Sequence, residues 1–185
     1  MNRWSAGKET ILDFADIIKF HGHSCPGLAT GYRLATAAMN ALGVTRSDDE
    51  ELFAVVENDS CGVDAIQCVC GCTFGKGNLV FRDYGKHACS LFSRVKQQGV
   101  RVVFHGKALP AELRHDRPAF AKRIMAEQED AIISVTMIPY EELQPARIRN
   151  SVICAACGEP VMDTRLRETA RGNVCIPCAE RTTSS

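Results

Sequence analysis

Ten cysteines in a chain of 185 residues constrain this protein more than any other feature of its sequence. Four of them form two pairs near the C-terminus, Cys154-x2-Cys157 and Cys175-x2-Cys178, and the pairs are separated by residues 158–174. This spacing is typical of zinc sites, because each pair on a tight turn directs two thiolates toward one ion. Four thiolates close a tetrahedron without an open position, so we expect a structural zinc site.

The segment that carries these cysteines is predicted to be a separate small domain. Pro139, Pro145 and a charged stretch indicate a boundary near residues 140–152. We therefore expect a core domain over residues 1–145 and a four-cysteine zinc-finger domain over residues 146–185. Such a short tail cannot hold a hydrophobic core of its own, and metal binding worth roughly 10–16 kcal/mol is enough to fold it.

Two alternatives to zinc remain for the tail. Four thiolates also suit an iron centre of the rubredoxin type, although the second pair reads C-I-P-C where rubredoxins have C-P-x-C. The other alternative is a pair of disulfides or inert thiols.

Opposite charges in the tail cancel, so a role of the tail in stability or partner docking is favoured over sequence-specific binding to DNA.

The charge balance excludes several classes of protein. Lysine plus arginine and aspartate plus glutamate number 22 each, so the formal net charge is zero. Binding to nucleic acid or to an anionic membrane needs a basic excess, and we expect neither. Apolar runs are far shorter than the ~20 residues that span a bilayer, and MNRWSAGKET lacks the apolar stretch of a secretory signal. We therefore expect a cytoplasmic protein with reduced cysteines.

Hydrophobic periodicity predicts alternating helices and strands before the boundary. Pro26 and Gly43 favour the start and the end of one clear helix. The predicted helices cover residues 8–20, 26–42, 61–70 and 117–130, and the predicted strands cover 52–57, 79–84, 89–95, 100–105 and 132–138. The order lacks a strict βαβ repeat, so we expect an α+β fold with a mixed sheet flanked by helices.

Two further cysteines are predicted to lie where helices begin. Cys25 directly precedes a predicted helix, and Cys61 falls in the first turn of another. The N–H donors and partial positive charge of a helix start predict a lowered pKa for both thiols. With the nearby His21 and His23 they form a candidate metal site, and three such ligands with an open position would be of the catalytic type.

The predicted helix over residues 61–70 also has a polar, thiol-rich face. Steps of about 100° per residue place four side chains on one side of it: Cys61, Asp64, Cys68 and Cys72. From this face and the preceding helix start we take Cys25, Cys61 and Asp64 as candidate catalytic residues. Cys68, Cys70 and Cys89 are interpreted as core or bystander residues.

A glycine-rich loop follows that helix at residues 71–78. Its glycines would let backbone N–H groups approach a ligand, and Lys76 would add a positive charge. The loop is not a P-loop, because G-x4-G-K-[ST] is absent. An anion-binding cradle and a plain glycine-rich turn are both open.

The stretches HGHSCPGLATGYRLA and ENDSCGVDAIQCVCGCTFGKGNLVFRDYGK resemble the FmdE family, named after one component of formylmethanofuran dehydrogenase. The resemblance covers roughly residues 10–140, and the C-terminal pairs match a zinc finger that many members append. It implies a thioredoxin-like core, a treble-clef type finger and a metal-binding active site. Cys68 and Cys70 depart from the family pattern. The motif residues it carries over are His21, His23, Cys25, Cys61, Asp64, Gln67, Cys72 and Lys76.

The resemblance also implies a function. Some members are linked to molybdenum or tungsten formylmethanofuran dehydrogenase, which reduces CO2 onto a carrier in methanogenesis. We therefore expect an accessory subunit of such an enzyme, with Zn²⁺ in the finger and a second Zn²⁺ or other transition metal in the core. The alternatives are a stand-alone metal- or thiol-dependent enzyme of one-carbon or redox metabolism, and a metal-handling module. A homodimer is expected from the prevalence of such assemblies.

Overall fold

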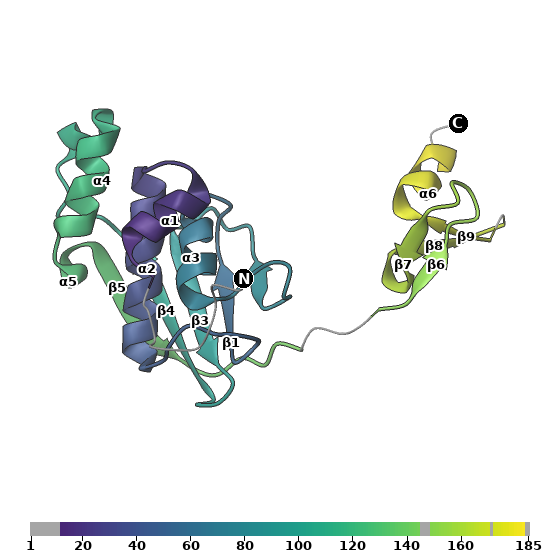
Figure 1. Cartoon of the computed structure of the whole chain (residues 1–185), viewed down its shortest axis with the longest axis horizontal. Coiled ribbons are helices and arrows are strands. Elements are labelled where there is room, and N and C mark those ends of the chain that lie inside the picture. The colour runs from purple at the N-terminus through teal and green to yellow at the C-terminus, as the bar shows by residue number, and fades with distance from the viewer. Residues whose placement is uncertain (1–11, 145–148, 171, 184–185) are drawn as a thin grey trace, which may run out of the picture. The chain divides into compact units, whose positions relative to one another are not determined.

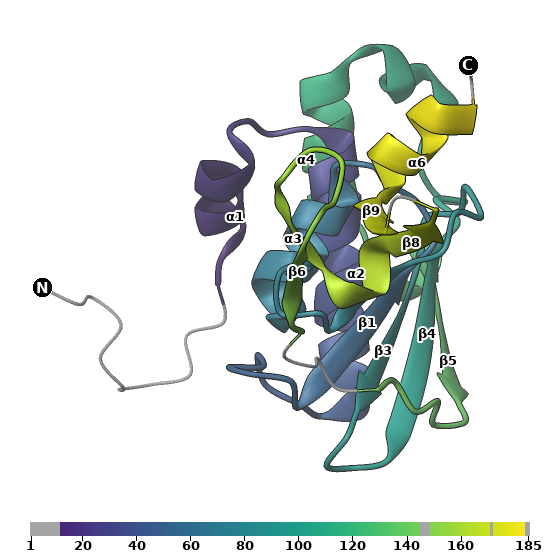
Figure 2. The same cartoon turned by 90° about the vertical axis from the view of Figure 1, so that its right-hand side faces the viewer.

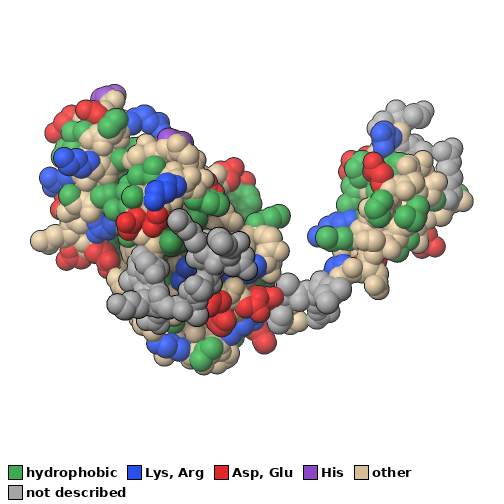
Figure 3. Space-filling view, in the orientation of Figure 1, with side chains coloured by type: hydrophobic (Ala, Val, Ile, Leu, Met, Phe, Trp, Pro, Cys, Tyr) green, Lys and Arg blue, Asp and Glu red, His purple; other side chains and the backbone are tan. Residues whose placement is uncertain are grey.

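A computed structural model describes residues 12–144, 149–170 and 172–183 (Figure 1). The chain divides into two compact units, Met1–Pro145 and Ala146–Ser185. Among the described residues, no helix combines the length and the apolar character needed to cross a membrane. Acidic and basic side chains are interspersed on the face of each unit seen in Figure 3, so that face presents no extended field of one sign.

The first unit is built on one mixed sheet of five strands in the order β2-β1-β3-β4-β5. The strands are β1 (Leu52–Val56), β2 (Leu79–Phe81), β3 (Ala88–Ser93), β4 (Gln98–Phe104) and β5 (Ile133–Ile138). β1 and β2 run parallel, and the other neighbouring strands pair antiparallel. The strands predicted over 89–95 and 100–105 are present as β3 and β4, and the prediction of a mixed sheet flanked by helices is confirmed.

Helices pack against one face of this sheet, where α2 and α3 lie beside the strands in Figure 2. The helices are α1 (Phe14–His21), α2 (Pro26–Leu42), α3 (Gly62–Cys70), the 3-10 helix η1 (Ala111–His115), α4 (Arg117–Ala126) and α5 (Glu129–Ile132). Leu28 and Leu34 of α2 are buried with Leu91, Val100 and Val102 of the sheet. The main hydrophobic core therefore lies between α2 and the central strands.

The opposite face of the sheet has a smaller apolar cluster. Phe53 and Phe92 stack with their ring centroids 4.6 Å apart. Tyr140 and Leu143, from the segment that follows β5, pack over them. This segment therefore covers part of the sheet face opposite α2 and α3.

Local signals in the sequence set the ends of the helices. Asp13 caps α1 by accepting a hydrogen bond from the Asp16 N–H at 2.9 Å. Pro26 begins α2, and Gly43 ends it in the left-handed conformation, with a φ of 59°. The first predicted helix starts at residue 8, but residues 8–11 lie outside the described residues, and α1 begins at Phe14.

Two predicted elements are too long. The strand predicted over 79–84 ends at Phe81, because its partner there is Val56, the last residue of β1. The helix predicted over 117–130 is interrupted after Ala126. The Arg33 guanidinium of α2 donates hydrogen bonds to the carbonyls of Ile124, Met125 and Glu127, which satisfies the last carbonyls of α4 and ends it there.

The second unit consists of two short hairpins followed by a helix. Its elements are β6 (Ser151–Ile153), β7 (Pro160–Met162), η2 (Asp163–Arg165), β8 (Leu166–Thr169), β9 (Gly172–Cys175) and α6 (Ile176–Thr183). β6 pairs with β7, and β8 pairs with β9. Its buried cluster is small and consists of Cys154, Val174, Cys175 and Cys178. Three of these four residues are the predicted zinc ligands, as expected for a zinc finger.

Candidate metal centres

Two stretches of the first unit, residues 21–25 and the start of α3, bring together the side chains of His21, His23, Cys25 and Cys61. Their ligand atoms all lie within 4.8 Å of one another. Bond lengths to zinc place neighbouring donor atoms roughly 3.3–3.8 Å apart, so the four side chains need only small adjustments to surround one ion. Two imidazoles and two thiols are also a donor set that zinc and related metals accept. We call these four residues the core site.

The helix starts that carry the two cysteines meet because glycines line the contact between α2 and α3. A Cβ atom on Gly31 would lie 2.1 Å from the carbonyl oxygen of Gly62, so the two backbones touch. A Cβ atom on Gly27 would lie 3.2 Å from the Cβ of Cys61. The sequence analysis did not assign these glycines to the site. The spacing Gly27-x3-Gly31 is nevertheless one that favours close contact between helices.

The core site is buried on one side and exposed on the other. Cys25 is only 3 % exposed, and its sulfur caps α2 by accepting the Leu28 N–H at 3.4 Å. Cys61 is half-buried, and His23 is exposed. The rings of His21 and His23 lie 4.6 Å apart between centroids. A ligand would therefore reach the site from the side of His23.

The predicted lowering of the Cys61 pKa is wrong for the metal-free protein. Cys61 is the N-cap residue of α3 rather than part of its first turn, and its side chain makes no capping hydrogen bond. Burial raises the pKa of this thiol above its ordinary value, and the neighbouring Cys25 raises it further. At this position, desolvation and a neighbouring thiol raise the pKa by more than the helix start lowers it.

Asp64 does not belong to the group of ligands but contacts one of them. Its Oδ2 lies 2.7 Å from Nδ1 of His21, whereas Nε2 of the same ring lies 4.0 Å from the Cys25 sulfur. The Gln67 amide donates to Oδ1 of Asp64 at 3.4 Å, and its Oε1 accepts the Phe74 N–H at 3.1 Å. Two further motif residues, Asp64 and Gln67, therefore lie behind the core site.

The predicted thiol-rich face of α3 does not extend to Cys72. The helix ends at Cys70, and Gly71 adopts a φ of 72°, which directs the chain away from the helical path. Cys72 is fully buried, and burial raises its pKa to about 12. Among the described residues, neither Cys72 nor the half-buried Cys68 joins a group of metal ligands. The prediction that Cys89 lies in the core is confirmed.

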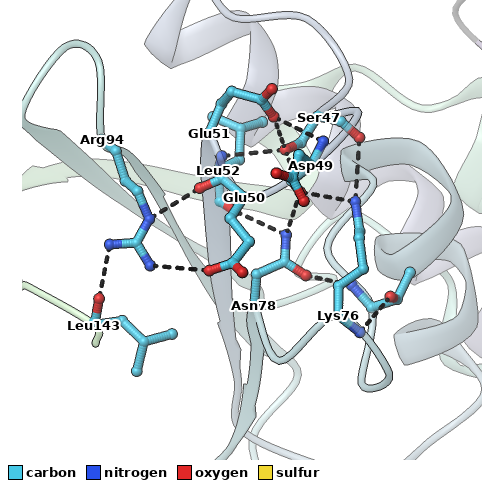
Figure 4. A network of polar contacts seen from close by, with 10 residues as sticks. Ser47, Asp49, Glu50, Glu51, Leu52, Lys76, Asn78, Arg94 and Leu143 are labelled. Atoms are coloured by element: carbon cyan, nitrogen blue, oxygen red, sulfur yellow. Dashed lines mark hydrogen bonds and ion pairs between the residues drawn. The ribbon is translucent and has the colours of Figure 1, made fainter. Parts of the chain in front are cut away.

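The glycine-rich loop is a structural turn held by Lys76 and Asn78. The Lys76 ammonium donates to the carbonyls of Ser47, Asp48 and Asp49 at 3.4, 3.2 and 2.8 Å. The buried Asn78 donates to the carbonyls of Asp49 and Leu52 (Figure 4). The ammonium group that could bind an anion therefore already donates to three backbone carbonyls. This favours the interpretation of the loop as a plain glycine-rich turn.

The tail cysteines form a second group, whose four sulfurs all lie within 4.8 Å of one another. The sulfurs of Cys157 and Cys175 are 3.9 Å apart, close to the separation of two thiolates on one zinc ion. The Cys175 N–H donates to the Cys154 sulfur at 3.3 Å, and together with the backbone N–H groups of Cys157 and Ala156 it lowers the pKa of that thiol to about 6. The Arg181 guanidinium lies 3.1 Å from the Cys178 sulfur and adds positive charge. This arrangement supports a structural zinc ion.

Comparisons with known proteins agree with this architecture. A protein of Archaeoglobus fulgidus named as a probable S-adenosyl-L-methionine-binding protein is 32% identical over 189 aligned residues. The match covers 87% of this chain and 50% of the relative, so the chain spans about half the length of that protein. A crystal structure of a tungsten formylmethanofuran dehydrogenase FmdE-like protein from Syntrophus aciditrophicus shares the fold. Its TM-score is 0.70 at 22% identity, over 96% of this chain and 98% of that one.

Two families account for the two units. Residues 147–183 match the prokaryotic dksA/traR C4-type zinc finger. Residues 20–146 match the family described as FmdE, molybdenum formylmethanofuran dehydrogenase operon. The resemblance expected from the sequence is thereby confirmed: the chain belongs to the FmdE family.

Proposed function

We propose that the core site binds a transition-metal ion, with zinc as the first candidate, in addition to the zinc ion of the finger. The observation that carries this proposal is the convergence of four nitrogen and sulfur donors, from two stretches of the chain, within 4.8 Å. If water takes the place of the exposed His23, the ion would act as a Lewis acid and lower the pKa of that water molecule. The buried Cys25 anchors the site in the core, and the exposed His23 leaves one side accessible.

We propose further that the chain is an accessory protein of a molybdenum or tungsten enzyme of the formylmethanofuran dehydrogenase type. The description of the matched family supports this role, and so does the name of the structural neighbour. In this proposal the core site serves the partner's one-carbon or redox chemistry, and the zinc finger contributes to the docking surface.

A second candidate is a stand-alone metal-dependent protein that binds a small molecule. All four donors of the core site come from one chain, and the site is accessible without a partner. The relative from Archaeoglobus fulgidus carries a name that refers to S-adenosyl-L-methionine binding, which makes that compound the first ligand to test.

Counting metal ions tests the core site. Elemental analysis of the wild-type chain should give two metal ions, and Cys61→Ala should retain one, held by the tail. Cys68→Ala is the matched control, because Cys68 is half-buried on the same helix but outside both ligand groups. A single metal ion in the wild-type chain would contradict the proposal.

Binding experiments separate the two candidate functions. We expect the purified chain to co-elute in size-exclusion chromatography with a molybdenum or tungsten formylmethanofuran dehydrogenase prepared without its own FmdE component. Separate elution at micromolar concentrations would contradict the accessory role. Isothermal titration of the isolated chain with S-adenosyl-L-methionine addresses the second candidate, which predicts saturable heat that Cys61→Ala abolishes.

A further inference from the structure

We propose that Asp64 and Gln67 are positioning residues that keep the proton of His21 on Nδ1 and direct its Nε2 lone pair at the core metal site. This inference rests on the proposed metal site and assigns roles to residues outside the ligand group. It also revises our interpretation of Asp64, which the sequence suggested as a catalytic residue in its own right.

The two nitrogens of the His21 ring have different neighbours. Nδ1 lies 2.7 Å from a carboxylate oxygen of Asp64, and Nε2 lies 4.0 Å from the Cys25 sulfur among the other donors. An ionised carboxylate only accepts hydrogen bonds, so the nitrogen beside it must carry the proton. Nε2 is then the nitrogen with a free lone pair, which is the form of imidazole that binds a metal ion.

Asp64 is itself held in place by Gln67. The backbone N–H of Phe74 can only donate, so the Gln67 atom that it contacts is the amide oxygen. The amide nitrogen of Gln67 must then be the atom that faces Asp64, to which it donates at 3.4 Å. Asp64 and Gln67 lie three residues apart on one side of α3, and Asp64 is in its first turn, where the helix favours a negative charge.

Of the two histidines in the core site, Asp64 holds His21 and not His23. The His21 side chain is 10 % exposed and bonded to Asp64, whereas His23 is exposed, and no side chain in the described part of the chain donates to it or accepts from it. His21 is therefore the fixed imidazole of the core site, and His23 is the replaceable one. Asp64 is 37 % exposed, so its replacement should leave the fold intact.

The first experiment determines the tautomer of His21 without any metal. In the chain freed of core metal and held at a pH where the ring is neutral, ¹⁵N NMR of the histidine rings should show the Nδ1–H form in the wild type. Asp64→Ala should shift His21 toward the Nε2–H form. A wild-type His21 protonated on Nε2 would overturn the proposal.

The second experiment measures cobalt(II) binding to the core site after the tail has been filled with zinc. We expect Asp64→Ala to lower the cobalt affinity about 10–100-fold and to alter the visible spectrum of the bound ion. Asp64→Asn should restore part of the affinity, because its amide oxygen can accept the same hydrogen bond. Gln67→Ala should give a smaller loss, and Asp59→Ala, which removes an exposed carboxylate from the loop before α3, should give none.

The outcomes separate this inference from the proposed function. If the wild type binds cobalt in the core and Asp64→Ala binds it with equal affinity and an unchanged spectrum, the positioning role is wrong and the metal site stands. If the wild type takes up no cobalt in the core, the proposed metal site is wrong, and the tautomer of His21 still decides whether Asp64 directs the ring.

Discussion

The two cysteine-rich sites of this protein stand in different relations to the hydrophobic core. In the tail, Cys154, Cys175 and Cys178 make up most of the small buried cluster, so the metal ligands are the core. In the first unit the core site lies where α2 and α3 begin, and apolar side chains between these helices and the sheet stabilise the fold. Metal binding should therefore fold the tail, whereas the first unit should present a largely formed site.

Removing the metal gives the largest effect expected from this difference. A strong chelator should unfold the tail, because its fold depends on the roughly 10–16 kcal/mol that a structural zinc ion supplies. In ¹H–¹⁵N correlation spectra we expect the amide signals of residues 149–183 to lose their dispersion and those of residues 12–144 to keep it. Added zinc should restore the tail. A tail that stays folded without metal would contradict this distinction between the two sites. So would a first unit that unfolds together with the tail.

Forcing α2 and α3 apart should give the second largest effect. Gly31→Ala places a Cβ 2.1 Å from the Gly62 oxygen, and backbone atoms cannot yield as a flexible side chain can. We expect a loss of about 3 kcal/mol in the free energy of unfolding, measured with denaturant. The core site should lose its metal and the tail should keep its own. The control is Gly75→Ala, since no atom lies within 4 Å of the position that its Cβ would take. Equal stability of the two variants would show that the glycine contact is not required.

Lys76 should matter for stability and not for metal binding. Lys76→Ala removes hydrogen bonds to three carbonyls in a partly exposed loop, and we expect a loss of about 1–2 kcal/mol in the free energy of unfolding. The metal content should stay unchanged, and so should the stability of Lys107→Ala, an exposed lysine. If phosphate raises the melting temperature of the wild type but not of Lys76→Ala, the loop is an anion site after all.

The smallest effect concerns the reactivity of Cys61 and leaves stability untouched. Because burial and Cys25 raise the pKa of Cys61, its thiolate fraction at neutral pH is below that of a free cysteine in the metal-free chain. The rate of its alkylation by iodoacetamide, followed by peptide mapping, should keep rising as the pH passes 9. Glutathione provides the reference thiol. A rate that levels off near pH 7 would mean that the helix start does activate Cys61.

Much of this architecture could be predicted because short-range signals determine it. Pro26 and Gly43 set the ends of α2, and the spacing of Cys154, Cys157, Cys175 and Cys178 indicated one four-thiolate site. The long motifs around Cys25 and Cys61 identified the family, which the comparison confirmed. The role of the core site residues in metal binding stays a prediction.

Contacts between distant segments could not be predicted from one sequence. The end of α4 depends on Arg33, some ninety residues earlier in the chain, and no local signal announces it. The pKa of Cys61 depends on how deeply the packing of α2 buries it, which the helix-start argument leaves out. The placement of Asp64 behind His21 likewise requires that α1 and α3 lie side by side.

The backbone contact between Gly31 and Gly62 has a consequence for ion selectivity. Because the main chains of α2 and α3 touch there, the crossing of the two helices sets the backbone separation of Cys25 and Cys61, and only rotation of two short side chains adjusts the distance between their sulfurs. An ion whose bonds require a wider gap than these side chains can reach would have to displace whole helices. Ionic radius should therefore act together with donor preference in deciding which metals this pair of thiolates retains.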